Sequence, residues 1–348
     1  MKALEEKKAA VIGLGRMGLE HIGAYKSVGA TVIAGADIKE EARKLAETRS
    51  PGIRIYADWQ ELLAKETPDI VSIVTNGPSH AEITIAAAGR KVPIIFCEKP
   101  MTTSMANANR MLEACKMSGS KLIVNLTLRV FPSFEKLLAL LHAGEIGEIR
   151  SVSVVISGRR GLGCVGTHYL DIMRVIIGSN AVRAWGRIDK TGTPNVRGPQ
   201  FKDPGGYGIY EFENGARGFI EMSEDLWHRP FMSIIGTLGK VLVDMTTNKW
   251  GDKIGKRVEV HKLVAKEGSP DPDIVHVPFD AGERTDNMAG TTLALEDIGR
   301  NGGKMGTGED GRAALEMVMA LHISDLRGNQ LIDLPLSGKD LDYDVPMT

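Results

Sequence analysis

The sequence predicts an α/β protein built from two parts: an N-terminal doubly wound parallel sheet and a C-terminal α/β domain with a large, mainly antiparallel open sheet. The chain has 348 residues, more than one hydrophobic core usually supports. Short apolar runs alternate with helical patterns from residue 9 to about 125, as in βαβ units. From about residue 149 the pattern changes to longer strands separated by turns. We therefore expect two domains, 1–126 and 127–348.

Five apolar runs in the N-terminal half are predicted as strands, and the segments between them as helices. Residues 70–74 are nearly all apolar, as expected for a parallel strand that is covered on both faces. The predicted strands are 9–13, 31–36, 70–74, 93–97 and 121–124, and the predicted helices are 16–28, 39–48, 59–65, 79–89 and 104–118.

The C-terminal half is predicted to contain strands at 149–157, 181–188, 206–213, 216–222, 231–236 and 239–244. Asn214-Gly215 separates two of these runs, which is a strong hairpin signal. A helix is expected to end near Gly178, and residues 246–280 are expected to form strands with long loops. Two late helices are predicted at 282–300 and 309–326. The spacing from Thr307 to Asp310 is that of a capping box.

The composition excludes several classes of protein. Apolar residues make up 43% and charged residues 25% of the chain, which is ordinary for a globular protein. Lys and Arg (43) nearly balance Asp and Glu (44), so we expect neither nucleic acid nor a membrane as partner. The three cysteines have no metal-type spacing and are expected to be reduced thiols in a cytoplasmic protein. No metal site is expected, because the histidines include no His-x-x-x-His pair.

A glycine-rich turn follows the first predicted strand, Gly13-Leu14-Gly15-Arg16-Met17-Gly18. Gly13 permits a tight turn, Gly15 lets the backbone approach a pyrophosphate, and Gly18 lets the helix pack on the strand. The helix that opens near Arg16 offers unpaired N–H groups to phosphates. Asp37 ends the next strand, where its carboxylate suits ribose hydroxyls and repels a 2′-phosphate. The pattern predicts a dinucleotide site that takes NAD, with NADP less favoured although Lys39 softens the repulsion.

Polar residues follow the later strands at the edge where ligands bind in such sheets. Thr75, Asn76 and His80 follow one strand, Glu98-Lys99-Pro100 follows the next, and Asn125 follows the last. Pro100 favours an extended Lys99, and a partly desolvated lysine there would stabilise a substrate oxygen as it becomes an alkoxide. The alternative is a solvated loop lysine.

The segment from Gly161 to Asp171 leads into a predicted helix. His168 is in line with apolar positions four and seven residues later, and Asp171 is close enough in sequence to orient it. Such a histidine suits a general base that accepts a hydroxyl proton. The alternative is a core histidine whose ring is satisfied by Asp171.

In their order along the chain, these segments resemble the Gfo/Idh/MocA oxidoreductase family, which includes glucose–fructose oxidoreductase and inositol dehydrogenase. Glu98-Lys99-Pro100 and the Gly-x-His-x-x-Asp segment are more specific than the glycine motif. The matching segments are 13–18, 76–80, 98–100, 129–132, 144–147, 166–171, 236–239 and 331–336.

The resemblance implies a Rossmann domain and a C-terminal domain whose open sheet forms a homodimer or homotetramer contact. It implies that Lys99 and His168 face the nicotinamide, that His80 and Glu98 shape the cofactor pocket, and that the Lys99–Pro100 bond is cis. Many members carry an aspartate four residues before the histidine, where this chain has Cys164. A thiol is a poor acceptor for sugar hydroxyls, so we interpret Cys164 as a packing residue rather than a nucleophile.

Four further residues, with Tyr169, are candidates for substrate contact. Arg159 and Arg160 precede the His168 segment, and paired guanidiniums suit a carboxylate or phosphate; ordinary surface arginines are the alternative. Trp227 and His228 follow a predicted strand, where they could line a sugar site by stacking. We favour the alternative, in which they lie at the edge of the core or in a subunit contact.

These features predict an NAD-dependent oxidoreductase that interconverts a secondary alcohol and a ketone on a sugar, cyclitol or related small molecule. Lys99 polarises the reacting oxygen and His168 moves the proton. One alternative is a lyase or glycosidase that oxidises transiently, eliminates and reduces again; another is a non-catalytic NAD-binding regulator.

Overall fold

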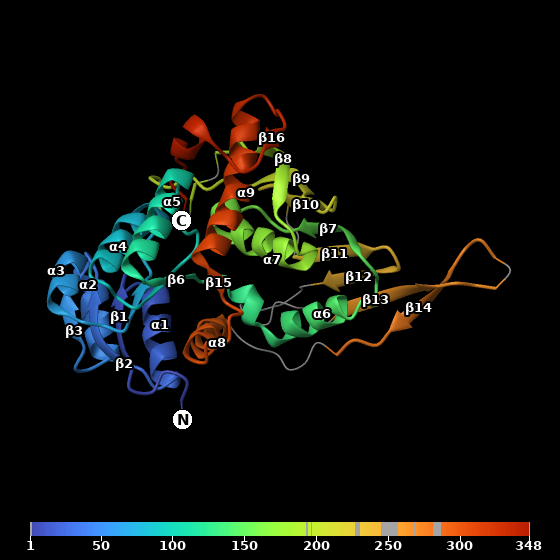
Figure 1. Ribbon diagram of the computed structural model, residues 1–348. Helices are drawn as coiled ribbons and strands as arrows, with labels where there is room; N and C mark the ends of the chain where they lie inside the picture. The colour runs from blue at the N-terminus through green and yellow to red at the C-terminus, as the bar shows by residue number, and fades with distance from the viewer. Residues whose placement is uncertain are drawn as a thin grey trace. The chain divides into compact units, whose positions relative to one another are not determined.

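The computed structural model describes residues 2–192, 194, 195, 197–226, 230–244, 257–267, 269–280 and 287–347 (Figure 1). The chain divides into two compact units. The first comprises residues 1–130, 287–315 and 341–348, and the second comprises residues 131–286 and 316–340. Both units therefore include segments from the C-terminal part of the chain. The helix at 308–326 begins in the first unit and ends in the second.

The first unit contains a seven-stranded sheet in the order β15-β6-β5-β4-β1-β2-β3. All neighbouring pairs are parallel except β15 with β6. The strand order reverses between β1 and β4, which makes this the topological switch point where ligands bind in doubly wound sheets. The strands are β1 Lys8–Ile12, β2 Thr31–Ala36, β3 Arg54–Tyr56, β4 Ile70–Ile73, β5 Ile94–Cys97, β6 Lys121–Val124 and β15 Gly306–Thr307.

Capping residues mark the ends of several helices of the first unit. Asp58 accepts the N–H of Gln60 at the start of α3, and Ser104 accepts the N–H of Asn107 at the start of α5, as N-caps do. Gly119 ends α5 in the left-handed conformation. The helices are α1 Arg16–Ser27, α2 Glu40–Arg49, α3 Trp59–Lys65, α4 Gly77–Gly89, α5 Met105–Ser118 and α8 Asn287–Gly299, with a 3₁₀ turn at Thr127–Val130.

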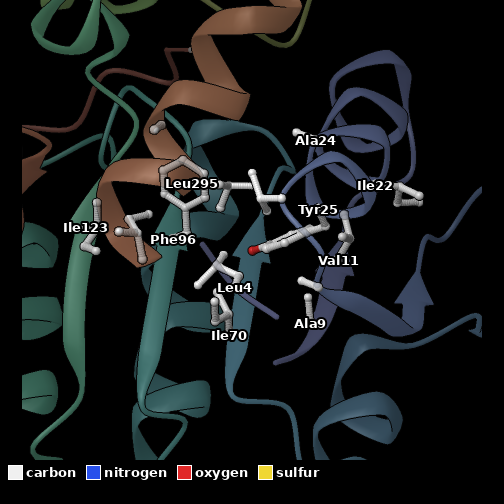
Figure 2. Packing of buried hydrophobic residues seen from close by; sticks show 14 of the residues in the cluster. Leu4, Ala9, Val11, Ile22, Ala24, Tyr25, Ile70, Phe96, Ile123 and Leu295 are labelled. Carbon is white, nitrogen blue, oxygen red and sulfur yellow. The ribbon is translucent and has the colours of Figure 1, made fainter. Parts of the chain in front are cut away.

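A hydrophobic core joins α1, the central strands and α8. Tyr25 of α1, Phe96 of β5 and Leu295 of α8 are fully buried in it (Figure 2). The helix α8 lies beside α1 (Figure 1), although more than 250 residues separate them in sequence. The first unit is thus completed by a late segment of the chain.

The second unit contains a nine-stranded sheet in the order β14-β13-β12-β11-β7-β10-β9-β8-β16. Its pairs are antiparallel except β7 with β10. The hairpin predicted at Asn214-Gly215 joins β9 and β10, with Gly215 at φ +81°. The strands are β7 Ile149–Val155, β8 Ala181–Ile188, β9 Gly206–Phe212, β10 Arg217–Met222, β11 Phe231–Gly236, β12 Gly239–Asp244, β13 Arg257–Val264, β14 Asp273–Val277 and β16 Ile332–Asp333.

One face of this sheet is buried and the other is partly exposed. On the buried face, Gly186 and Gly208 leave room for Leu321 of α9, which would lie about 2.5 Å from a Cβ at either position. On the opposite face Ile209 and Phe219 are 41% and 36% exposed. The helices of this unit are α6 Pro132–His142, a π-helical turn at Leu162–Gly166, α7 Thr167–Ile177, the C-terminal part of α9 Gly308–Leu326, and a 3₁₀ turn beginning at Gly338.

The predicted fold class is confirmed: an α/β protein with a mostly parallel Rossmann sheet and a mainly antiparallel second sheet. The capping box is also present, because Asp310 N–H donates to Thr307 Oγ1 and Thr307 N–H donates to Asp310 Oδ2. The strands β3, β15 and β16, the helix α6, the two 3₁₀ turns and the π-helical turn were not predicted. Residues 246–256 and 268 of the predicted segment 246–280, and residues 282–286 of the predicted helix 282–300, lie outside the described residues. Within the described ranges, no helix is long and apolar enough to cross a bilayer.

Candidate active site

The glycine turn after β1 is built as its sequence predicts. Gly13 has φ +96°, and its N–H donates to Ala36 O at the end of β2. A Cβ on Gly18 would lie 1.9 Å from Gly13 O, so the helix start touches the strand end through backbone atoms. A Cβ on Gly15 would meet nothing within 4 Å. The N–H groups of the first turn of α1, which include those of Arg16 and Met17, have no intrahelical acceptors.

The different surroundings of Gly15 and Gly18 predict different defects for the two alanine variants. Gly15→Ala is expected to unfold at the parent's temperature and to bind NAD about tenfold or more weakly, because its methyl group occupies space that the pyrophosphate needs. Gly18→Ala is expected to lose about 1–3 kcal/mol of unfolding free energy, because its methyl group overlaps a backbone oxygen. Thermal unfolding and calorimetric titration with NAD measure both. Equal stability of the two variants would contradict the assignment.

Asp37 links the glycine turn to the end of β2. Its carboxylate accepts the N–H of Leu14 at 2.7 Å and the N–H of Lys39 at 2.8 Å. Arg43 donates to the carbonyl oxygens of Asp37 and Ile38. The acidic side chain is therefore held in place at the β2 end of the turn.

The segment after β4 adjoins the glycine turn, because a Cβ on Gly13 would lie 2.6 Å from the backbone of Val74. Ser79 Oγ donates to Thr75 Oγ1, and Asn76 is the N-cap of α4. His80 is buried, with Nδ1 2.9 Å from Pro100 O and Nε2 3.2 Å from Thr75 O. Burial lowers the pKa of His80 more than these two carbonyl contacts raise it, so the ring is neutral at pH 7.

Glu98, Lys99 and Pro100 follow β5, and the Lys99–Pro100 bond is cis as the resemblance implied. Glu98 is 8% exposed and Lys99 is half-buried. Burial alone would raise the pKa of Glu98, but the hydrogen bonds from His21 and the Asn125 amide and the charge of Lys99 together lower it. A buried carboxylate is thus held ionised next to Lys99.

Asn125, after β6, belongs to the same edge. Its Nδ2 donates to Glu98 Oε1 at 2.7 Å, and its side chain is 3% exposed. Its Oδ1 is buried and has no hydrogen-bond partner among the described residues. Buried acceptors of this kind are usually satisfied, so this oxygen fits a donor group of a bound molecule.

His21, Ser72 and Tyr25 were not predicted as site residues, yet they join this arrangement. His21 contacts both Ser72 Oγ and Glu98 Oε1, and Tyr25 contacts Ser72 Oγ. The sequence offers one indirect signal, which is a histidine among the mostly apolar residues on the buried face of α1.

The second unit holds the segment from Arg159 to Asp171. Asp203 accepts the N–H groups of Gly163 and Cys164 at 2.7 and 2.8 Å, and so caps the π-helical turn. Gly161 has φ +80°, and a Cβ there would overlap Asp203. Asp203 was not predicted, because it lies 40 residues away in the chain.

The helix α7 begins at Thr167 and ends before Gly178, near which the end of a helix was predicted. His168 is half-buried in its first turn, Asp171 is fully buried, and burial raises the pKa of Tyr169. Cys164 is half-buried, and its sulfur is a thiol rather than part of a disulfide. Arg159 and Arg160 are exposed. Trp227 and His228 lie outside the described residues. Lys99 belongs to the first unit and His168 to the second.

A 3-2-1-4-5-6 parallel sheet with this glycine turn and acidic residue defines a dinucleotide-binding protein of the Rossmann class. Comparison with known proteins agrees. The profile of an oxidoreductase family with an NAD-binding Rossmann fold, Gfo/Idh/MocA, matches residues 7–126. The chain belongs to the Gfo/Idh/MocA oxidoreductase family.

Relatives in this family include sugar and cyclitol dehydrogenases. A D-apiose dehydrogenase from Rhizobium rhizogenes is 30% identical over 260 residues, which are 68% of this chain and 73% of the relative. An inositol 2-dehydrogenase from Pseudomonas syringae pv. syringae is 34% identical over 145 residues, which are 40% of this chain and only 43% of the relative. A levoglucosan dehydrogenase solved with NADH and levoglucosan shares the fold, with a TM-score of 0.78, 20% identity and coverage of 95% of this chain and 100% of that one.

Proposed function

We propose that the protein is an NAD-dependent oxidoreductase that interconverts a secondary alcohol and a ketone on a sugar, a cyclitol or a related polyhydroxylated molecule. The observation that carries the proposal is the ionised, buried Glu98 beside Lys99 at the ligand-binding edge of a Gfo/Idh/MocA Rossmann unit. Relatives named D-apiose dehydrogenase and inositol 2-dehydrogenase support the substrate class.

The first unit suits NAD in several places. The open space at Gly15 and the N-terminus of α1 fit the pyrophosphate, and Asp37, held by two backbone N–H groups, favours ribose hydroxyls over a 2′-phosphate. The buried Asn125 Oδ1, which has no hydrogen-bond partner among the described residues, suits a ligand donor beside Glu98. Thr75, Asn76 and His80 are proposed to line the same cofactor pocket. When bound, NAD accepts hydride from the substrate carbon. We propose domain 1–126 for cofactor binding and 127–348 for substrate binding and self-association.

Lys99 and His168 are proposed as the catalytic residues. The Lys99 ammonium donates a hydrogen bond to the reacting oxygen and stabilises negative charge as it develops there. The His168 imidazole accepts the hydroxyl proton as the carbonyl forms, and Asp171 orients the ring. In the reverse direction His168 returns that proton. Cys164 packs beside this segment and takes no proton in the reaction.

The substrate is proposed to be neutral or anionic. Arg159 and Arg160 are exposed ahead of the His168 segment and suit a carboxylate or phosphate group on the substrate. Tyr169 is buried and shapes the segment rather than donating to the substrate.

A panel of D-apiose, inositols, levoglucosan, sugar acids and sugar phosphates, offered with NAD and with NADP, tests the proposal. We expect stoichiometric NADH formation with at least one member and slower reaction with NADP. Product formation without net NADH, detected by NMR, would instead indicate transient oxidation and elimination. Tight NAD binding without any turnover would indicate a regulator.

The partly exposed face of the nine-stranded sheet is proposed as the contact between copies of the chain. Trp185, Ile209 and Phe219 occupy paired positions on three neighbouring strands, and exposed apolar patches of this kind mark interaction sites. The double variant Ile209→Asp, Phe219→Asp is expected to have a lower mass than the parent by light scattering at equal concentration. The control Met117→Asp changes an 80% exposed side chain on α5 and should keep the parent's mass. A parent that is monomeric throughout would contradict the proposal.

A further inference from the structure

A line of buried polar side chains crosses the core of the first unit and ends at Glu98. Tyr25 Oη lies 2.8 Å from Ser72 Oγ, Ser72 Oγ lies 3.0 Å from His21 Nδ1, and His21 Nε2 lies 3.1 Å from Glu98 Oε1. Tyr25, Ser72 and His21 are all 0% exposed. Tyr25 lies among the apolar side chains of the core (Figure 2). Polar groups in such surroundings are costly unless each one is satisfied.

When the donors and acceptors of these three side chains are counted, one arrangement with a neutral imidazole gives every donor an acceptor. Tyr25 O–H donates to Ser72 Oγ, Ser72 O–H donates to His21 Nδ1, and His21 Nε2–H donates to Glu98 Oε1. A doubly protonated ring would donate its Nδ1–H to Ser72 Oγ. Ser72 would then either donate to Tyr25, whose own proton would lose its acceptor, or accept from both neighbours, which would leave the Ser72 proton without either of them as acceptor. The two hydroxyls therefore select the tautomer that donates to the carboxylate.

Glu98 receives donors on both oxygens. Oε1 accepts from His21 Nε2 and Asn125 Nδ2, and Oε2 accepts from the backbone N–H of Lys99 at 3.3 Å. The other titratable groups that act on this carboxylate are Lys99 itself, the neutral His80 of α4 and the buried thiol of Cys97. Of the side chains that hold it from other elements, only His21 and Asn125 donate to it among the described residues.

We propose that His21 is a positioning residue: its Nε2–H holds the Glu98 carboxylate against the Lys99 backbone, and Ser72 and Tyr25 hold the imidazole in the tautomer that does so. The fixed anion attracts the Lys99 ammonium and directs it at the reacting oxygen, a consequence that rests on the proposed function. The geometric part stands without it, because it concerns only Glu98 and its donors.

Carboxyl titration in the protein without substrate tests the geometric part. Glutamate labelled with ¹³C at the side-chain carboxyl is followed by NMR, and the Glu98 signal is assigned by its absence in Glu98→Gln. In His21→Leu, burial is no longer opposed by this donor, and the carboxyl pKa is expected to rise by about one unit or more, a tenfold change in its acid constant. His21→Gln keeps an N–H donor and should restore most of the shift. Tyr25→Phe removes only the outermost hydroxyl of the line and should raise the Glu98 pKa less than His21→Leu does. Tyr210→Phe, which removes a buried hydroxyl that donates to Met317 O in the second unit, is the matched control and should leave the Glu98 titration near the parent's.

The consequence for Lys99 is tested by steady-state kinetics. The substrate is the member of the panel that the parent oxidises. His21→Leu is expected to lower kcat about tenfold or more, with the NAD Kd unchanged and partial recovery in His21→Gln. If His21→Leu is too unstable, Ser72→Ala, which removes the hydroxyl that selects the tautomer, replaces it with the same expected directions. An unchanged Glu98 titration in every variant would overturn the positioning role even if the enzyme is active. A shifted titration in a protein that oxidises no panel member would uphold the role and contradict the proposed function.

Discussion

Replacing Lys99 by Ala is expected to lower kcat for alcohol oxidation about 10²–10³-fold, because we propose its ammonium as the donor that stabilises charge on the reacting oxygen. Lys99 is half-buried beside the ionised Glu98, so its removal leaves a buried anion without its neighbouring cation. NAD affinity should stay within about twofold, since the glycine turn and Asp37 are unaffected. Steady-state kinetics and NAD titration by calorimetry measure the two effects separately.

Lys116→Ala is the matched control, because Lys116 is an exposed lysine on α5 of the same unit. It should keep the parent's kcat and NAD affinity. A Lys99→Ala variant with parental kcat, or one whose only defect is weaker NAD binding, would show that Lys99 holds the cofactor or the loop instead of acting on the substrate.

Replacing His168 by Ala is expected to lower kcat about 10²–10⁴-fold, the range for loss of a general base. The pH profile should change as well. On the proposed mechanism, oxidation by the parent is expected to fall at low pH, because a protonated imidazole cannot accept the hydroxyl proton. Without the imidazole that low-pH limb disappears, and the residual rate depends on solvent base.

His142→Ala is the control for this variant. His142 is an exposed residue at the end of α6 in the same unit, and its loss should change neither kcat nor the profile. A His168→Ala variant that retains the parent's low-pH limb would assign that limb to another group and remove His168 from the mechanism.

The sequence predicted the elements that have strong local signals. The helix 59–65 and the strands 31–36, 121–124, 181–188, 231–236 and 239–244 agree with the structure residue for residue, because apolar periodicity, caps and turn residues all favour the same element there. The strand β3 has only three residues, and β15 and β16 have two each. Strands this short depend on their partners, which no local pattern reveals.

The helix α6 shows a different limit. Pro132 occupies its first turn, where proline is favoured, and Leu137 and Leu141 lie on its buried face. The signal was therefore present in the sequence but was not interpreted as a helix.

The site residues also divide into those that a local motif predicts and those whose roles depend on distant partners. The roles of Gly13 and Gly18 follow from backbone geometry that the motif itself encodes. His21 and Asp203 are missing from the prediction because their partners lie 77 and 40 residues away. A lone histidine on a helix and a lone aspartate before a proline carry no information about such distant partners.

The central claim is that Lys99 and His168 serve one reacting oxygen. The crystal structure of the dead-end complex with NADH and the alcohol substrate tests it most directly. We expect Lys99 Nζ and one imidazole nitrogen of His168 each within about 3.2 Å of the same substrate oxygen, next to the nicotinamide. A complex in which either side chain is directed away from that oxygen, or in which the two lie on opposite sides of the molecule, would contradict the account.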